Sequence, residues 1–380
     1  MPFGKCLTLL FWTIMPPSTE MPAPFTRERR YYAFSRFLRE RFGAKVYRVT
    51  IDAGFTCPNV DGTVAVGGCV YCDNRSFSPN RRLPRTTIRE QVRRGIEIVQ
   101  KRYQATQFLA YFQAATNTYA PPEKLKKLYD EALDHPQVVG LAIGTRPDCL
   151  PDDVLDLIES YARDRYVCLE LGLQTIHDRS LDWMNRGHHF DAFVEAVERL
   201  NHRFVLRSSE APRFAPAPRS DSPDLIHCFA PAPCNETLDP PGAKRKPSLP
   251  SELDLCAHVI LGLPGESHDD MLATADALAR LPVHAVKIHN LHVVKDTPLK
   301  KMYERGEARM FERDEYVQVV CDFLEHLPPD MVIHRLSGDA PPDYLVAPLW
   351  CLDKPALLRA IRDELERRDS WQGKKCLGSQ

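Results

Sequence analysis

The N-terminal region of the sequence lacks an apolar run long enough to cross a membrane. Its apolar stretch, residues 7–15, follows a single lysine and ends at two prolines, whereas a spanning helix needs about 20 apolar residues. The stretch resembles the middle of a signal peptide, but no small-residue cleavage site precedes the prolines. We expect residues 1–28 to form a disordered extension, with a targeting segment in residues 1–25 as the alternative.

The chain also lacks a net charge of either sign. Its 50 Lys and Arg residues nearly balance its 51 Asp and Glu residues, and the formal net charge is −1. No global field therefore attracts nucleic acid or an anionic membrane, so a polyanion would need a local basic patch. The 43% share of apolar residues among 380 is enough for a substantial globular core.

A fourth metal ligand is missing from a cysteine-containing loop. Residues 54–72 carry Cys57, Cys69 and Cys72, with no further Cys or His at zinc-finger spacing. A structural zinc site has four protein ligands, whereas an iron-sulfur cube held by three thiolates leaves one iron open for chemistry. Glycines in this loop allow the backbone to wrap tightly around a cluster. The loop is typical of a cluster site; a small zinc site or plain buried thiols are the alternatives.

The other cysteines are scattered singly along the chain and are expected to be ordinary thiols. Unpaired cysteines together with an oxygen-sensitive cluster favour a reducing compartment. We therefore predict a cytoplasmic location, or an organelle if residues 1–25 are a targeting segment.

From about residue 45 the sequence alternates apolar runs with amphipathic segments, which is typical of parallel βα units. Strands are predicted at residues 46–52, 108–112, 138–143, 167–173, 256–261 and 285–289. Helices are predicted at residues 88–102, 122–133, 152–163, 191–202 and 269–281. This pattern predicts an α/β fold, a partial (βα)6 TIM-like barrel, in which the site lies at the carboxyl ends of the strands.

Residues 203–253 interrupt this alternation. They are rich in proline and show no sustained periodicity, which predicts a disordered insertion within a core of residues 29–300. Residues 301–380 are predicted to form a C-terminal extension with a charged helix at 355–368. The extension ends in a basic segment with Trp371 and Lys374, a weak indication of a polyanionic substrate.

Several motifs together resemble those of the radical SAM proteins of the YhcC/YtqA-like group. They are the loop 54–72 and the segments 111–121, 144–148, 170–175, 185–188 and 258–266. The resemblance covers residues 30–202 and 254–375 and implies a 4Fe-4S cluster on Cys57, Cys69 and Cys72. It also implies S-adenosylmethionine (SAM) on the open iron. The core of the group resembles those of the elongator catalytic subunit and of coproporphyrinogen dehydrogenase.

The resemblance further implies residues that contact SAM. Tyr71 occupies the aromatic position near the adenine, and Gln113 lies where many relatives carry glycines that bind the methionine amino group. In this chain Ala114 and Ala115 follow instead. Gly262 lies in a turn that passes close to the adenine. A tyrosine that packs the loop onto the barrel and an ordinary tight turn are the alternatives for Tyr71 and Gly262.

Polar residues near the end of the fourth predicted strand form a second candidate group. Glu170 and Gln174 flank a glycine there, and polar groups facing a cleft can hydrogen-bond a ribose or a carboxylate. Arg146 and Arg186 are candidate carboxylate clamps. Ordinary ion pairs, including a contact of Arg186 with Glu170 or Gln174, are the alternative.

The resemblance implies reductive cleavage of SAM to a 5′-deoxyadenosyl radical that abstracts hydrogen from a substrate. An electron donor such as flavodoxin or ferredoxin would then be a partner. Kinship with the elongator core and the basic C-terminal segment favour RNA, tRNA included, as the substrate. A small metabolite is the alternative within this class of enzyme, and a non-catalytic metal-binding interaction protein is the alternative outside it.

Overall fold

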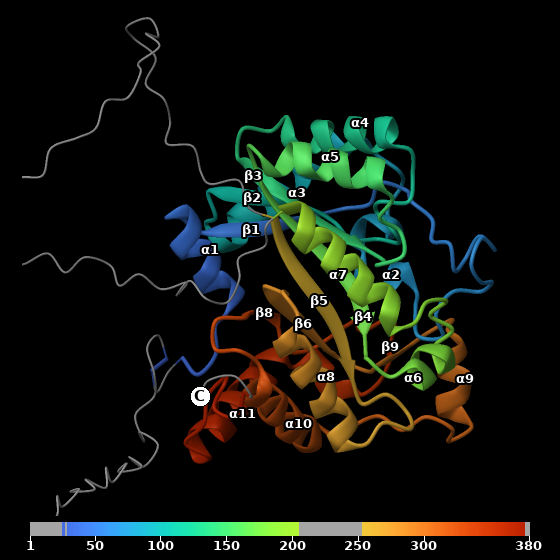
Figure 1. Ribbon diagram of the computed structural model, residues 1–380, viewed down its shortest axis with the longest axis vertical. Helices are drawn as coiled ribbons and strands as arrows, with labels where there is room; N and C mark the ends of the chain where they lie inside the picture. The colour runs from blue at the N-terminus through green and yellow to red at the C-terminus, as the bar shows by residue number, and fades with distance from the viewer. Residues whose placement is uncertain (1–24, 27–28, 205–252, 377–380) are drawn as a thin grey trace, which may run out of the picture.

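The computed structural model describes residues 25–26, 29–204 and 253–376 (Figure 1). Most of the predicted N-terminal extension and residues 205–252 of the predicted insertion lie outside the described residues. The ends of both predicted segments belong to the fold, because Phe25 is buried and Arg203 lies in a helix, where it pairs with Asp152 and Asp156. Within the described ranges no helix is both long and apolar enough to cross a membrane.

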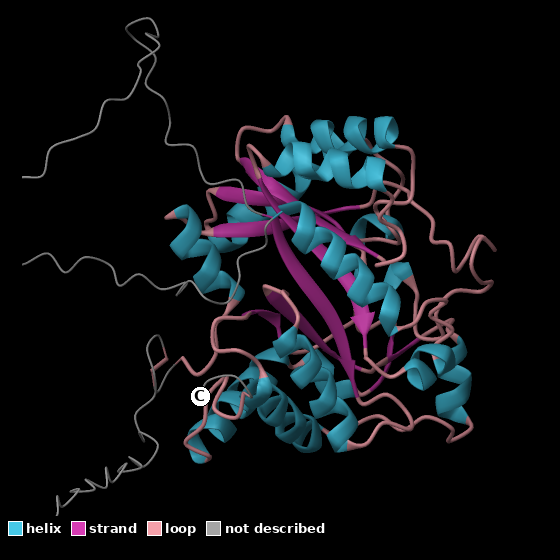
Figure 2. Cartoon of the chain, viewed as in Figure 1, coloured by secondary structure: helices cyan, strands magenta, loops and turns pink. Residues whose placement is uncertain are grey.

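Seven parallel strands form one curved, open sheet, which Figure 2 shows in magenta. The sheet order is β1-β2-β3-β4-β5-β6-β8, so the chain adds each strand beside the preceding one. The bounds are β1 Val46–Ile51, β2 Gln107–Phe112, β3 Val138–Thr145, β4 Tyr166–Gln174, β5 Leu253–Leu261, β6 Ala285–Asn290 and β8 Val332–Arg335. The six predicted strands are confirmed, and β8 adds a seventh strand from the region predicted as an extension.

Helices on the outer face of the sheet complete the βα units (Figure 1). The predicted helices are confirmed as α3 Ile88–Tyr103, α4 Pro122–Leu133, α5 Asp152–Ala162, α7 Phe190–Phe204, α8 His268–Arg280 and α11 Lys354–Arg367. Local signals fix their starts. The Thr87 hydroxyl accepts from the Glu90 amide at α3, and Ser267 with Asp270 forms a capping box at α8.

Several further helices and one extra pair of strands were not predicted. The helices are α1 Phe34–Phe42, α2 Asn74–Phe77, α6 Asp178–Trp183, α9 Pro298–Glu304 and α10 Arg313–His326, with 3₁₀ turns at Pro79–Arg82 and Leu349–Leu352. Strands β7 Val293–Val294 and β9 Leu345–Ala347 pair antiparallel. Helix α1 contacts both β1 and β8, and the Ile333 amide donates to the Tyr32 carbonyl. The N-terminal segment therefore covers the open side of the sheet.

The amino ends of the strands enclose an apolar plug. Inward-facing residues at the strand starts, such as Val46, Tyr166 and Val332, form one buried cluster with Phe34 and Trp371. The basic C-terminal segment, a weak indication of a polyanionic substrate in the sequence, is thus partly built into the fold. The Trp371 side chain is 8% exposed, and Gln372 is fully buried and hydrogen-bonded to the Tyr32 amide and the Met331 carbonyl.

The C-terminal region shares the main core with the barrel. Phe323 and Val320 of α10 and Ile361 of α11 belong to the same buried cluster as Val286 of β6 and Val259 of β5. Because this cluster continues without a break across residue 300, unfolding of α10 should expose apolar surface on the sheet as well. The boundary proposed at residue 300 stays a prediction.

Replacing Phe323 by alanine should lower the free energy of unfolding by about 3–5 kcal/mol, because the aromatic ring is fully buried and leaves a cavity. Urea unfolding followed by circular dichroism should show one transition at a lower midpoint. Ile98→Ala is a matched control on an exposed helix face. Two separate transitions in the wild-type protein would contradict the shared core.

Candidate functional site

A cavity of about 530 Å³ opens at the carboxyl ends of the strands. This volume lies in the range of small-molecule sites. The cysteine loop, the ends of β2 to β6 and the segment after β8 all contribute to its lining. Of the predicted site residues, Cys57, Cys69, Tyr71, Cys72, Gln113, Arg146, Glu170, Gln174 and Arg186 line this cavity. Gly262 is not among the lining residues. All the other residues predicted from the sequence for this site line the same cavity.

The cysteine loop is held in shape by backbone hydrogen bonds on both sides. The Val70 amide donates to the Met184 carbonyl after α6 at 3.0 Å, and the Leu299 amide of α9 donates to the Val70 carbonyl at 2.9 Å. Gly67 and Gly68 have φ of 86° and 77°, a region that favours glycine. The loop is therefore fixed between two short helices that the sequence did not predict.

The three loop thiols differ in their surroundings. Cys69 is buried, Cys57 is half-buried and Cys72 is exposed, and none forms a disulfide. Two side chains direct N–H groups at the Cys69 sulfur: Asn59 Nδ2 lies 3.5 Å away and Arg186 Nη1 lies 3.6 Å away. Such donors stabilise negative charge on a thiolate ligand.

The donor set fits an iron-sulfur cluster better than a single ion. Two thiolates on one zinc ion, with bonds of about 2.3 Å, lie close together. Within the described chain, the group whose ligand atoms all lie within 4.8 Å of one another is Cys168, Glu170 and His334. The three loop cysteines do not meet this condition, as expected if they surround several irons. In the group of Cys168, Glu170 and His334, the Glu170 carboxylate is already paired with Arg48 and Lys287.

Arg186 and Arg146 form hydrogen bonds that hold the segments around the cavity together. Arg186 Nη2 donates to the Gly172 carbonyl at 2.8 Å, and a Cβ atom at Gly172 would lie 2.4 Å from that nitrogen. Arg146 donates to the Arg186 carbonyl at 2.8 Å and to both carboxylate oxygens of Asp148. Arg186 thus contacts a loop sulfur and backbone, and the alternative contact with Glu170 or Gln174 is not formed.

The remaining SAM candidates occupy strained or tightly packed positions. Gln174 and Ala115 have φ of 75° and 61° at the ends of β4 and β2, and such strain is concentrated at functional sites. Gln113 donates to the Phe77 carbonyl at 3.0 Å. Tyr71 both lines the cavity and packs against the apolar cluster of α6 and α9. Gly262, with φ of 87°, lies against the Phe311 ring, which a Cβ atom would approach to 2.9 Å.

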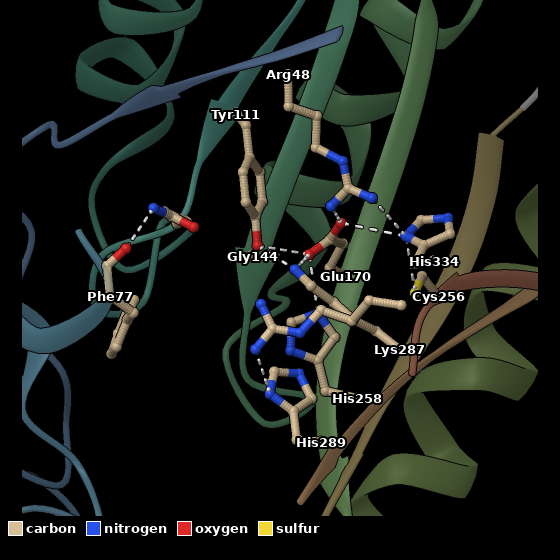
Figure 3. Close-up of polar contacts among 12 residues, drawn as sticks. Arg48, Phe77, Tyr111, Gly144, Glu170, Cys256, His258, Lys287, His289 and His334 are labelled. Carbon is tan, nitrogen blue, oxygen red and sulfur yellow. Dashed lines mark hydrogen bonds and ion pairs between the residues drawn. The ribbon is translucent and has the colours of Figure 1, made fainter. Parts of the chain in front are cut away.

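Below the cavity lies a buried polar layer that the sequence analysis did not predict. Its members come from six of the seven strands: Arg48, Tyr111, Glu170, His258, Lys287 and His334. We call these six residues the ionic layer. Figure 3 shows them gathered around the Glu170 carboxylate. That carboxylate lies inside the barrel, with its side chain fully buried, rather than at the exposed end of β4.

Four donors surround the carboxylate of Glu170, one at Oε1 and three at Oε2. Oε1 accepts from Arg48 at 2.7 Å. Oε2 accepts from Lys287 at 2.7 Å, from the Tyr111 hydroxyl at 2.7 Å and from His258 Nε2 at 2.8 Å. The Lys287 ammonium also donates to the Tyr111 oxygen at 2.6 Å. Charge-assisted hydrogen bonds of this kind are roughly twice as strong as neutral ones.

Burial and charge compete in this layer. Burial alone would raise the pKa of Glu170, but Lys287 and Arg48 outweigh it and hold this pKa well below its usual range. Burial lowers the pKa of Lys287 to about 8 against the opposing effect of Glu170. Burial, assisted by nearby cations, also lowers the pKa of His258 to about 4 and of His334 to about 3. Both imidazoles are therefore neutral at pH 7, and the layer carries one surplus positive charge.

The comparison with known proteins gives the same picture of the fold. The model of the Radical SAM superfamily matches residues 63–207, and that of the Radical_SAM C-terminal domain matches residues 283–367. The chain is 38% identical to "Uncharacterized protein YtqA" of Bacillus subtilis, covering 93% of this chain and 95% of that protein. It is 34% identical to "Protein YhcC" of Escherichia coli K12, covering 84% and 86%.

More distant similarities cover smaller parts of larger proteins. The tRNA uridine(34) acetyltransferase of Methanocaldococcus jannaschii is 21% identical over 59% of this chain and 32% of its own length. The solved structure of Elp3 from Methanocaldococcus infernus has a TM-score of 0.57 and 16% identity, covering 86% of this chain and 64% of that one. The similarity to Elp3 is evidence about the fold alone.

The ionic layer predicts that Glu170→Gln lowers the free energy of unfolding by about 3–5 kcal/mol, because Arg48 and Lys287 lose their buried counter-charge. Urea midpoints at pH 7 measure the effect. The double variant Glu170→Gln/Lys287→Met should recover part of the loss, since one uncompensated charge is then removed. Glu97→Gln, an exposed pair with Arg93, is the control and should leave the midpoint unchanged.

The same variant has an expected pH dependence. The folded-state pKa of Glu170 lies below its unfolded-state value of about 4.3. Its stabilising contribution is therefore complete above that value and is lost as the pH falls towards the folded-state pKa. The difference in midpoint between wild type and Glu170→Gln should shrink below about pH 4.3. A constant difference from pH 7 to pH 3 would contradict the role assigned to the ionised carboxylate.

Proposed function

Because the chain belongs to the radical SAM superfamily, whose enzymes use a 4Fe-4S cluster and SAM, we propose that Cys57, Cys69 and Cys72 ligate the cluster. The observation that carries this proposal is the position of the three thiols. They line one cavity, on a loop fixed at both sides, with Asn59 and Arg186 donating to the Cys69 sulfur. A non-catalytic metal site would not need a cavity of this size beside it.

When bound, the cluster and SAM supply a 5′-deoxyadenosyl radical for hydrogen abstraction. The protein's own residues bind and orient SAM and the substrate. We assign Tyr71, Gln113, Gln174 and Arg186 to contacts with SAM, because each lines the cavity beside the loop. Glu170 and Gly262 support these residues. Glu170 fixes Lys287 and His258 in the cavity floor, and Gly262 allows Phe311 to approach the backbone.

We propose RNA, with tRNA as the first candidate, as the substrate. One support is the similarity to a protein named tRNA uridine(34) acetyltransferase. The other support is Arg82, which lines the cavity and whose guanidinium lies 5.6 Å from the ring centre of Tyr344; the guanidinium of Arg75 lies 6.0 Å from the same ring. Arginines beside aromatic rings bind single-stranded nucleic acid through charge and stacking.

The electron donor is proposed to be a small redox protein such as flavodoxin or ferredoxin. Cys72 is exposed, and the apolar side chains of Val60, Val64 and Val66 on the same loop are exposed as well. Apolar surface next to a redox centre suits a transient protein contact. The free thiols and the proposed cluster favour a cytoplasmic location for the reaction.

Anaerobic reconstitution should give about four irons per chain and broad absorbance near 400 nm, as expected of a 4Fe-4S protein. Cys57→Ala, Cys69→Ala and Cys72→Ala should each abolish this absorbance, because each removes a ligand. Cys149→Ala and Cys321→Ala are matched controls at buried cysteines outside the loop and should retain it. Equal loss in the controls, or tightly bound zinc in the wild type, would refute the cluster assignment.

Reduced wild-type protein should convert SAM to 5′-deoxyadenosine, and tRNA should bind and stimulate this conversion. Chromatography of the nucleoside and filter retention of labelled tRNA measure the two effects. Arg82→Gln should weaken tRNA retention several-fold, since a positive charge leaves the cavity mouth. Arg309→Gln, an exposed arginine paired with Glu315, is the control. Formation of 5′-deoxyadenosine without any tRNA retention would favour the small-metabolite alternative.

A further inference from the structure

The part of the cavity wall that follows β6 and β8 carries a second cluster of basic side chains. His289 is on β6, His292 follows that strand, and Arg335 ends β8. All three line the cavity, as does Lys287 of the ionic layer. Figure 3 shows His258 and His289 one after the other on the side of Glu170 away from Arg48. The hydrogen bonds to the Cys69 sulfur come from Asn59 and Arg186, not from this wall.

Hydrogen bonding determines which nitrogen of His289 carries the proton. Burial, followed by the charge of Arg335, lowers the pKa of His289 well below its usual value, so the imidazole is neutral. Arg335 Nη2 lies 3.1 Å from His289 Nδ1, and guanidinium nitrogens can only donate. Nδ1 is therefore the acceptor, and the proton lies on Nε2.

Two donors in this cluster have no acceptor. Among the described residues, His289 Nε2 and Arg335 Nε are both buried and lack any hydrogen-bond partner. A buried donor without a partner costs about 1–3 kcal/mol, so two neighbouring ones in a cavity wall are expected to serve a ligand. Both are donors, and the ligand group must therefore be an acceptor.

The local charge favours an anionic acceptor. Lys287 and Arg335 both line this wall, and the carboxylate of Glu170 is already paired with its own donors. The nearest acid to Arg335 is Asp339, whose oxygen lies 3.9 Å from Nη1 and whose side chain is 45% exposed. Such a distant, solvated carboxylate compensates the guanidinium only weakly.

The backbone is shaped to keep these groups together. A Cβ atom at Gly338 would lie 3.1 Å from the His292 ring and 3.3 Å from Arg335 Nη2. The Gly338 amide donates to Asn290 Oδ1 at 3.0 Å, which ties the segment after β8 to the end of β6. The cluster is therefore built from two neighbouring strands and their loops, and it is held in place before any ligand binds.

We propose that Arg335 and His289 form an oxyanion subsite that holds a phosphate or carboxylate group of the substrate. Arg335 contributes charge and Nε–H, and His289 contributes Nε2–H, so the substrate group accepts from both. This inference rests on the proposed function, because it assigns a chemical feature to the substrate of that same cavity. RNA offers phosphate groups, and many small metabolites offer carboxylates.

The test uses full-length, anaerobically reconstituted protein saturated with SAM, so that the carboxylate of SAM occupies its own position. Inorganic phosphate and, separately, acetate are titrated and followed by calorimetry. At least one of them should bind at one site per chain, and the better ligand identifies which oxyanion the substrate carries. Arg335→Gln should weaken this binding at least about tenfold, the equivalent of one charge-assisted contact.

His289 provides a second, graded measurement. His289→Gln keeps an N–H donor near the position of Nε2 and should retain most of the affinity, whereas His289→Leu should lose it. Arg93→Gln, on the exposed face of α3, is the control and should bind like wild type. Iron content shows that each variant is folded.

Two results would overturn the subsite. One is the absence of binding of both anions to the wild type, or binding that Arg335→Gln leaves unchanged. The other is weakened SAM binding in Arg335→Gln with unchanged anion binding, which would assign the arginine to SAM. Neither result bears on the proposed function, which fails separately if wild-type protein holds no 4Fe-4S cluster or forms no 5′-deoxyadenosine.

Discussion

The arrangement of the barrel interior depends on the buried carboxylate of Glu170. An isolated charge of this kind would cost many kcal/mol to remove from water, and it is tolerated because Arg48 and Lys287 approach within 2.7 Å. Each partner comes from a different strand, so the ion pairs fix the positions of β1, β4 and β6 relative to one another. Replacement by apolar residues could stabilise the fold equally well. What the ions add is a polar floor at a defined depth.

That floor determines where a cofactor and a substrate can lie. Below it, apolar residues at the strand starts fill the barrel with Phe34 and Trp371. Above it, Gly144 and Gly172 place no side chain into the cavity that the strand ends surround. The Arg48 guanidinium also stacks on the rings of Phe34 and Tyr111, at 4.4 and 5.1 Å from their centres. The polar floor is thus supported from beneath by the N-terminal helix α1.

The sequence could predict the repeated part of the fold and the cysteine loop, because both have local signals. Strands and helices alternate with clear periodicity, and the spacing of Cys57, Cys69 and Cys72 is itself informative. The ionic layer has no local signal. Arg48, Lys287 and His334 come from separate short strands, and their meeting depends on register across six strands. A charged residue at an inward position of a buried strand was the available sign, since such residues are rarely buried unpaired.

The sequence also could not separate residues that face the cavity from residues that support it. The sequence predicts both Glu170 and Arg186 as cofactor ligands. In the structure Glu170 pairs within the ionic layer, whereas Arg186 lines the cavity and also donates to Cys69 and the Gly172 carbonyl. His289 and Arg335, whose Nε2 and Nε atoms lack an acceptor, lie outside the segments that the sequence analysis singled out. Motifs describe the chemistry that relatives have in common, whereas unsatisfied polar atoms show where this chain still lacks a partner. The substrate-specific part of the site is therefore best sought at the ends of β6 and β8. There the contacts that hold the wall in place are formed, while two donors have no acceptor.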